Sequence, residues 1–345
     1  MPTEAEAASM AQIARQFMDD FRVPGLSLAI ARHGQFTYRE GFGLADKESN
    51  ERVTPAYLFR IASVSKPITS AALYSLLDQG KLKLDDPVFG PGGHLESEYG
   101  GVAGEFEKQI TLHQLLTHTT GGWENNRKDP MFLQPALDQH ELISWTLQHQ
   151  PLTAAPGGRY AYSNFGYCVL GRVLEKIAQQ PYADFVQQHV LANCEVGGMR
   201  LAGNTLADRN AGEVVYYSQD GGNPYGMNVR RMDSHGGWLA TASDLVRFAT
   251  HVDGFNTTPS FLSAAALKAM TTPSAVNTFY ASGWSVNKVP NWWHEGSLPG
   301  TMSILVRTAS GLCWAALANT RAKGMESAID SLMWKIVKAV PAWKA

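Results

Sequence analysis

Patterns typical of β-strands occupy both ends of this chain, and helical patterns fill the stretch between them. Near the start, two strand-like segments meet at His33-Gly34, a dipeptide typical of a hairpin turn. Further helices are expected at the two ends, over residues 5–21 and 325–340. The extended segments are predicted at 26–31, 35–41, 282–287, 292–295, 302–307 and 312–317. This order predicts one sheet built from both termini and interrupted by a helical insertion.

The middle of the chain carries helical periodicity. Apolar residues recur at helical spacing over 164–179, where Val169, Val173 and Ile177 lie on one face. Ser243-Asp244 is typical of an N-cap, and it predicts a helix that runs to about residue 251. The remaining helices are expected at 70–80, 110–117, 140–149 and 262–270.

Composition excludes several classes of function. With 44% apolar and 17% charged residues the chain can form a substantial core, and its net charge of −2 offers nothing that would attract nucleic acid. No apolar run approaches the roughly 20 residues of a membrane span. Three cysteines, an odd and sparse count, argue against a disulfide framework and predict a cytoplasmic protein. The spacing of cysteines and histidines predicts no metal site, and we expect no cofactor.

Ser63-Val64-Ser65-Lys66 is the first of three motifs that carry chemistry. Ser63 and Lys66 stand three residues apart at an expected helix start, so the lysine amine can reach the serine hydroxyl. The helix N-terminus and partial burial both favour a neutral lysine, which can act as a base. A second copy of the spacing, Ser285 to Lys288, lies at an expected strand end and is not chosen.

Tyr162-Ser163-Asn164 is the second motif, at the junction between a loop and a helix. The Tyr162 phenol can relay a proton once nearby cations favour its anion. The Asn164 amide can hold a substrate or the lysine amine. Taken alone, these residues could equally be an ordinary buried aromatic and a helix cap.

His294-Glu295-Gly296 is the third motif, in an expected strand. Glycine in a strand often marks the close approach of another backbone or a ligand. The N–H groups of Ser297 and Ser63 could together form an oxyanion hole. Taken alone, His294 could be a core histidine.

The three motifs, in this order, resemble the serine β-lactamase/penicillin-binding-protein superfamily. The resemblance is to the branch that holds class C β-lactamases, D-alanyl-D-alanine carboxypeptidases, D-aminopeptidases and family VIII esterases. It extends from about residue 23 to 319. The blocks that carry it are Phe59 to Lys66, Ile110 to Gly122, Pro156-Gly157-Gly158 leading into Tyr162 to Tyr167, and Gly236-Gly237 through Ser243-Asp244-Leu245.

The resemblance implies an α+β fold, with an antiparallel β-sheet, N- and C-terminal helices and an inserted all-helical domain. We therefore expect a sheet domain of residues 1–62 plus 238–345, an inserted domain of 63–237, and an active site in the cleft between them. It also implies roles for the motif residues. Ser63 would be acylated, Lys66 and Tyr162 would share the base and acid work, and Asn164 would orient the substrate. His294 would replace the lysine of a Lys-Thr-Gly motif.

The expected function is a serine hydrolase that forms an acyl-enzyme on a small-molecule ester or amide. His-Glu-Gly in place of Lys-Thr-Gly disfavours substrates with a carboxylate, because Glu295 repels it, so a carboxylesterase on small to medium esters leads. The alternatives are a D-amino-acid amide or peptide hydrolase, a weak β-lactamase, an acyltransferase or a non-catalytic binder. Substrate contacts are predicted for Asn164, His294, Gly296 and Ser297, and pocket walls or plain core for Trp123, Tyr225, Trp238, Trp284 and Trp293.

Overall fold

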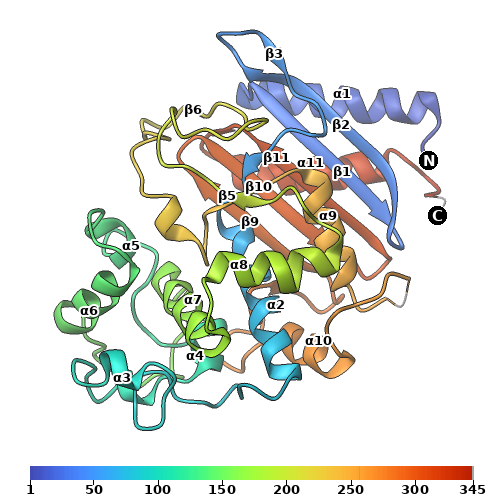
Figure 1. The fold of residues 1–345 in the computed structure, drawn as a ribbon. Helices are drawn as coiled ribbons and strands as arrows, with labels where there is room; N and C mark the ends of the chain where they lie inside the picture. The colour runs from blue at the N-terminus through green and yellow to red at the C-terminus, as the bar shows by residue number, and fades with distance from the viewer. Residues whose placement is uncertain (256, 344–345) are drawn as a thin grey trace.

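The computed structural model describes residues 1–255 and 257–343, and a seven-stranded sheet organises it (Figure 1). The strand order is β3-β2-β1-β11-β10-β9-β8, and every neighbouring pair is antiparallel. Strand β1 from the start of the chain pairs with β11 from its end, which confirms the sheet built from both termini. The strands are β1 (Gly25–Arg32), β2 (Gln35–Asp46), β3 (Glu51–Arg52), β8 (Ser285–Val286), β9 (Trp292–Leu298), β10 (Thr301–Arg307) and β11 (Leu312–Ala318).

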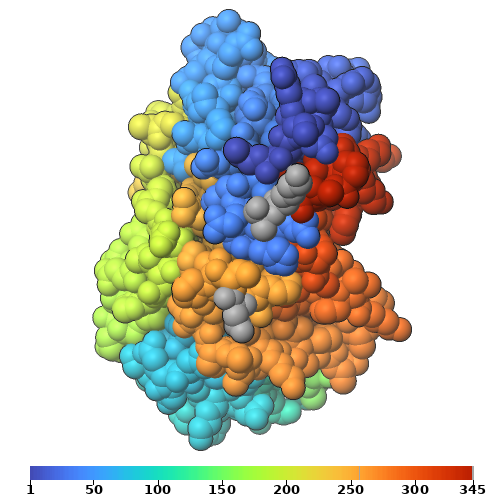
Figure 2. All heavy atoms as spheres, turned by 90° about the vertical axis from the view of Figure 1, so that its right-hand side faces the viewer, coloured from blue at the N-terminus to red at the C-terminus, as the bar shows by residue number. Residues whose placement is uncertain are grey.

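Helices cover both faces of the sheet. Helices α1 (Glu4–Phe21) and α11 (Met325–Lys338) lie side by side on one face, so the two chain ends meet there (Figures 1 and 2). Helix α9 (Ala242–His251) packs on the other face. Successive strand residues point to opposite faces, and in β11 Trp314 joins the core under α1 and α11 while Leu317 joins the core under α9. Burial on both faces explains why β11 is apolar almost without a break.

Helices are the main regular elements of the segment between the two halves of the sheet, and loops connect them. The sequence predicted an all-helical insertion, but this segment also contains two short strands. Strand β5 (Arg200–Leu201) pairs with β7 (Trp238–Ala240), and β6 (Tyr217–Ser218) pairs with β12 (Thr320–Arg321). The domain boundaries stay a prediction. The α-helices of this segment are α2 (Ser65–Asp78), α3 (Glu96–Tyr99), α4 (Leu112–Leu116), α5 (Pro130–Leu133), α6 (Gln139–His149), α7 (Asn164–Ala178) and α8 (Tyr182–Val186).

Helix α2 is the element that carries the first motif into the interior. Every residue from Ser65 to Leu76 is buried, since α2 packs against α7, α8 and, on its other side, α10 (Ala264–Thr271). The helical pattern predicted this helix over 70–80, five residues too late, whereas the Ser-x-x-Lys motif predicted a helix start near Ser63, close to the observed one. Pro67 does not prevent the earlier start, because first-turn N–H groups have no partner within the helix.

The start of α9 also differs from the prediction. Thr241 is the N-cap, two residues before the predicted Ser243-Asp244. Its hydroxyl accepts from the Asp244 N–H at 3.0 Å, and the Asp244 carboxylate accepts from the Thr241 N–H at 3.0 Å. This reciprocal capping box makes Thr241 a better N-cap than Ser243 or Asp244, which lie inside the first turn. Across the described part of the chain, no helix combines the length and apolarity needed to cross a membrane.

Candidate active site

Ser63 lies in a short 3₁₀ turn, Ala62–Val64, directly before α2. Ala62 adopts a left-handed backbone conformation with φ of 47°, which costs a non-glycine residue about 1–2 kcal/mol. This turn and the first turn of α2 bring Lys66 Nζ to 3.0 Å from Ser63 Oγ. The reach predicted from the three-residue spacing is therefore present in the structure.

Lys66 is fully buried and has three oxygen neighbours. Besides Ser63 Oγ, its Nζ lies 2.8 Å from Asn164 Oδ1 and 3.1 Å from the carbonyl oxygen of His235. A neutral amine has two N–H bonds and one lone pair, so it can donate to the amide and carbonyl oxygens and accept from the serine. Burial lowers the pKa of Lys66 to about 7, against the pull of the Asp129 carboxylate. Lys66 can therefore exchange a proton with Ser63 near neutral pH.

Asp129 is a member of the site that the sequence analysis missed. It caps α5 by accepting from the Met131 N–H at 2.9 Å, and its other oxygen accepts from Asn164 Nδ2 at 2.9 Å. Asn164 thus bridges the Asp129 carboxylate and Lys66. The sequence predicted that Asn164 could hold the lysine amine, and this contact is present. Asp-Pro before a helical turn is an N-cap pattern, but that pattern alone predicts a cap and not a partner for a lysine 63 residues earlier.

Tyr162 lies against Ser63 and Lys66. Lys66 Nζ is 4.8 Å from the centre of its ring. Burial raises the pKa of Tyr162 well above its usual value, and a hydrogen bond with Ser63 opposes this without cancelling it. The expectation that nearby cations would favour the phenolate is wrong, because the nearest amine is itself pushed toward its neutral form. Tyr162 therefore stays protonated near neutral pH, whereas the pKa of Lys66 lies near 7.

Gly296 places β9 directly against the turn that holds Ser63. A Cβ at this position would collide with the carbonyl oxygen of Ile61 and the hydroxyl of Ser303. The Ser303 hydroxyl donates to that same carbonyl at 2.7 Å, so β10 is tied to the turn as well. The predicted close approach of another backbone at this glycine is present, and the next residue, Ser297, borders the same hollow as Ser63.

His294 is 5% exposed, and both of its ring nitrogens have partners within the protein. Nδ1 lies 2.6 Å from the carbonyl oxygen of Glu295, and Nε2 lies 3.0 Å from the Tyr280 hydroxyl. Burial lowers the pKa of His294 to about 3, so the ring is neutral. His294 therefore supplies no positive charge in place of a lysine, and its ring nitrogens are not free for substrate.

Two hollows open on either side of Ser63, and both also reach Ser297. The first, of about 260 Å³, reaches Asn164 and includes the apolar side chains Phe132, Met232 and Leu298. The second, of about 290 Å³, is lined by Tyr160, Tyr162, Tyr280, His294 and Glu295. The exposed Glu326 at the start of α11 borders both hollows. Ser63 is thus accessible from a mixed side, where Arg321 and Glu326 accompany the apolar side chains, and from a side bordered by two carboxylates, Glu295 and Glu326.

None of the five aromatic residues predicted as pocket walls or plain core lines the two hollows beside Ser63, although Trp123 borders a separate hollow. Trp238 is fully buried, and its indole N–H donates to the Tyr182 hydroxyl at 3.3 Å. Trp123 packs edge-on against Phe165, with ring centres 4.9 Å apart. Tyr225 covers the guanidinium of buried Arg60, Trp284 is fully buried, and Trp293 packs at the edge of the core under α1 and α11. Apolar character predicts burial, but it does not tell a core position from a pocket wall.

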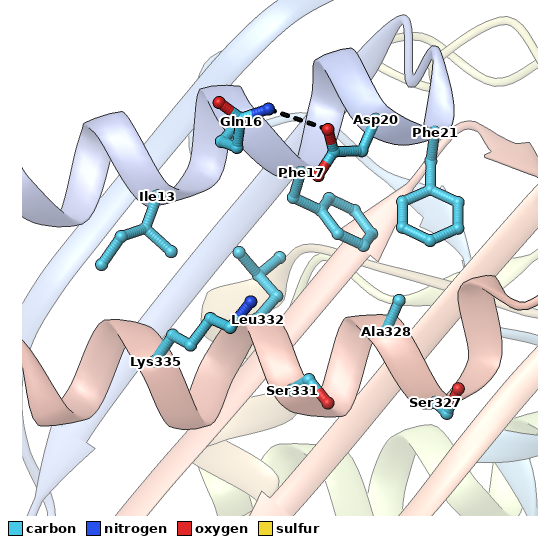
Figure 3. Close-up of a pocket in the computed structure, with 10 residues that line it drawn as sticks. All are labelled: Ile13, Gln16, Phe17, Asp20, Phe21, Ser327, Ala328, Ser331, Leu332 and Lys335. Atoms are coloured by element: carbon cyan, nitrogen blue, oxygen red, sulfur yellow. Dashed lines mark hydrogen bonds between the residues drawn. The ribbon is translucent and has the colours of Figure 1, made fainter.

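A larger hollow, of about 450 Å³, lies between α1 and α11 (Figure 3). Phe17 and Phe21 point into it from α1, and Leu332 points into it from α11. None of the three motifs contributes a side chain to its walls, so the chemistry does not lie there.

Among residues 1–255 and 257–343, no group of three or more metal-ligating side chains is close enough to hold an ion.

Comparisons with known proteins agree with this arrangement. The chain is 32% identical over 234 residues to esterase EstB of Burkholderia gladioli, a match that covers 65% of this chain and 57% of EstB. It is 22% identical to protein flp of Staphylococcus aureus (strain MW2), covering 91% of this chain and 63% of flp. The chain therefore spans less than two thirds of the length of these two relatives.

Solved structures share the fold. The D-alanine carboxypeptidase AmpC of Burkholderia cenocepacia superimposes with a TM-score of 0.78 at 22% identity, covering 97% of this chain and 99% of that one. This likeness confirms the predicted fold class. The model of the family described as Beta-lactamase matches residues 10–336. With the motifs, the fold and the site in agreement, the chain belongs to the beta-lactamase family.

Proposed function

We propose that this protein is a serine hydrolase that works through an acyl-enzyme at Ser63, and that its preferred substrates are carboxylic esters with small to medium acyl groups. One observation carries the proposal: a buried Lys66 amine, with a pKa lowered to about 7, lies 3.0 Å from Ser63 Oγ. A base whose pKa is near the working pH is the most effective at taking a proton from a hydroxyl.

The reaction follows from the positions of three groups. Neutral Lys66 takes the Ser63 proton as Oγ attacks the substrate carbonyl, and the backbone N–H groups of Ser63 and Ser297 stabilise the oxyanion. Protonated Tyr162 gives its proton to the leaving oxygen, and the Lys66 ammonium returns one to Tyr162. The alcohol leaves as the Ser63 ester forms. A water molecule then attacks that ester by the reverse path, which releases the acid and restores Ser63.

The two hollows give the substrate a direction. Tyr162 opens into the second hollow, so the leaving group that receives its proton belongs there. The acyl group then occupies the first hollow, beside Phe132 and Met232. A volume of about 260 Å³ limits that group to a small or medium size.

The charges of the second hollow support esters over β-lactams. Glu295 and Glu326 border the hollow where a carboxylate-bearing leaving group would lie, and His294 is neutral. The same carboxylates would attract a substrate ammonium, which favours amides of D-amino acids as the second candidate. Transfer of the acyl group to an alcohol instead of water would use the same intermediate. The proposal includes the cytoplasmic location predicted from the three sparse cysteines.

Hydrolysis of a small substrate panel by the wild type and by Ser63→Ala tests the proposal. The panel holds short and medium p-nitrophenyl esters, a chromogenic cephalosporin and a D-alanyl p-nitroanilide. We expect ester turnover to dominate and to fall by at least about a hundredfold in Ser63→Ala, because the nucleophile is removed. Dominant cephalosporin or anilide turnover would move the protein to the alternatives. Ester turnover that the mutation leaves unchanged would refute Ser63 as the nucleophile.

A further inference from the structure

A continuous chain of hydrogen bonds joins the second motif to the third behind the second hollow. It begins at the backbone N–H of Ser163, 3.1 Å from Nδ1 of His118. Nε2 of His118 lies 3.2 Å from the Tyr280 hydroxyl, which lies 3.0 Å from Nε2 of His294. Nδ1 of His294 ends the chain, 2.6 Å from the carbonyl oxygen of Glu295.

The backbone groups at the two ends of this series of hydrogen bonds fix which ring nitrogen of each histidine carries the proton. A backbone N–H can only donate, so Nδ1 of His118 is bare and the neutral ring carries its proton on Nε2. A backbone carbonyl can only accept, so Nδ1 of His294 carries the proton and its Nε2 is bare. The Tyr280 hydroxyl then accepts from His118, and its own proton has two neighbouring acceptors, the bare Nε2 of His294 and the hydroxyl oxygen of Tyr167. The two histidines are therefore opposite tautomers.

The surroundings keep both rings neutral. His118, Tyr280 and His294 are each at most 5% exposed. Burial lowers the pKa of both histidines, and the nearby Lys66 amine lowers each further. The hydroxyl of neighbouring Tyr167 donates to the carbonyl oxygen of Leu116, so it supplies no proton to Tyr280.

The chain of bonds also surrounds Tyr162. The Tyr162 ring centre is 4.3 Å from that of His118, 6.1 Å from that of Tyr280 and 6.2 Å from that of His294. His118 follows α4 with φ of 57°, a left-handed conformation that persists only where its surroundings hold it. Tyr280 comes from the segment before β8, and His294 comes from β9. His118 thus meets the segment of residues 280–294, which begins 162 residues later, at one hydroxyl.

We infer that Tyr280 is a positioning residue, which links His118 to Nε2 of His294 and holds the second and third motifs in register around Tyr162. Tyr280 acts through His118 and His294 and forms no bond to the reacting atoms. Its effect on turnover rests on the proposed function, whereas the tautomers do not depend on what Ser63 attacks.

Nitrogen-15 NMR of the histidine rings tests this inference without substrate. Resonances are assigned by comparison with His118→Gln and His294→Gln. We expect His118 to carry its proton on Nε2 and His294 on Nδ1, with neither ring titrating between pH 5 and 8. The same tautomer in both rings, or titration of His294 near pH 6.5, would overturn the inference.

Tyr280→Phe removes only the hydroxyl. The Nε2 resonance of His294 should then shift, because it loses its hydrogen-bond partner, while His118 keeps its proton on Nε2 because the Ser163 N–H still occupies Nδ1. Tyr160→Phe is the matched control: Tyr160 lines the same hollow, and neither ring has a hydrogen bond to it, so both patterns should stay. An unmoved His294 resonance in Tyr280→Phe would refute the role.

Kinetics of Tyr280→Phe separate positioning from general loss of structure. We expect kcat on the ester to fall by about tenfold to a hundredfold, as for a displaced catalytic group, while KM changes by less than about threefold. A KM effect without a kcat effect would contradict the inference. An inactive wild type that shows the expected tautomers would refute the proposed function and leave this inference standing.

Discussion

Two buried basic side chains lie near Ser63, and their surroundings give them different pKa values. Lys66 on α2 and His294 on β9 both lose solvent, which lowers the pKa of each. Lys66 faces oxygen acceptors and a buried carboxylate, Asp129, and its pKa stops near 7. His294 has Tyr280 as a hydrogen-bond partner and no carboxylate in hydrogen-bond contact, and its pKa falls to about 3. Burial alone makes a basic group neutral; a balancing charge keeps it able to exchange a proton at neutral pH.

The largest expected effect comes from removing the tuned base. Lys66→Ala should cut kcat/KM on the preferred ester by about 10²–10⁴-fold, because positioned proton transfer is lost. Lys66→Met fills the buried volume without a charge, so it separates lost chemistry from lost packing. The matched control is Lys288→Ala, which removes the exposed lysine of the second Ser-x-x-Lys copy and should leave kcat/KM unchanged. Equal losses in Lys66→Ala and Lys288→Ala would contradict the assignment.

Removing the Asp129 carboxylate should lower the pKa of Lys66 further, toward the low value seen for His294. Asp129→Asn keeps an N-cap for α5 but removes the carboxylate that raises the pKa of Lys66. In the wild type, kcat/KM should rise through a pH of about 7 as Lys66 becomes neutral. In Asp129→Asn this midpoint should lie at lower pH, because a lysine with a lower pKa becomes neutral sooner. Asp184→Asn, at an exposed carboxylate, should not shift it; a midpoint that rises in Asp129→Asn would contradict the tuning.

The smallest expected effect tests the other side of the comparison. His294→Lys places a cation beside the second hollow, and it should raise kcat/KM for a carboxylate-bearing cephalosporin by about threefold to tenfold, as expected for one partly screened charge. The control is His189→Lys on an exposed position. A fall in cephalosporin turnover would mean that the carboxylates bordering the hollow, and not the neutral histidine, exclude such substrates.

Local patterns predicted much of the fold and part of the site. The hairpin at His33-Gly34, the strands β9, β10 and β11 and the helices at both ends follow from periodicity and turn residues, and the structure confirms them. The contact between Ser63 and Lys66 follows from helix geometry. Asp129 and Tyr280 were not predicted, because neither shares a motif with the residues it contacts.

The sequence by itself determined the order of strands and helices, the nucleophile candidate and the lysine within its reach, because each depends on neighbours within a few residues. Only the tertiary structure decided which aromatics line a hollow and which fill the core, that Asp129 balances Lys66, and that burial keeps His294 neutral beside Tyr280. The pKa of a buried group depends on its distance to water and to other charges. Those distances are set by segments that lie far apart in the chain.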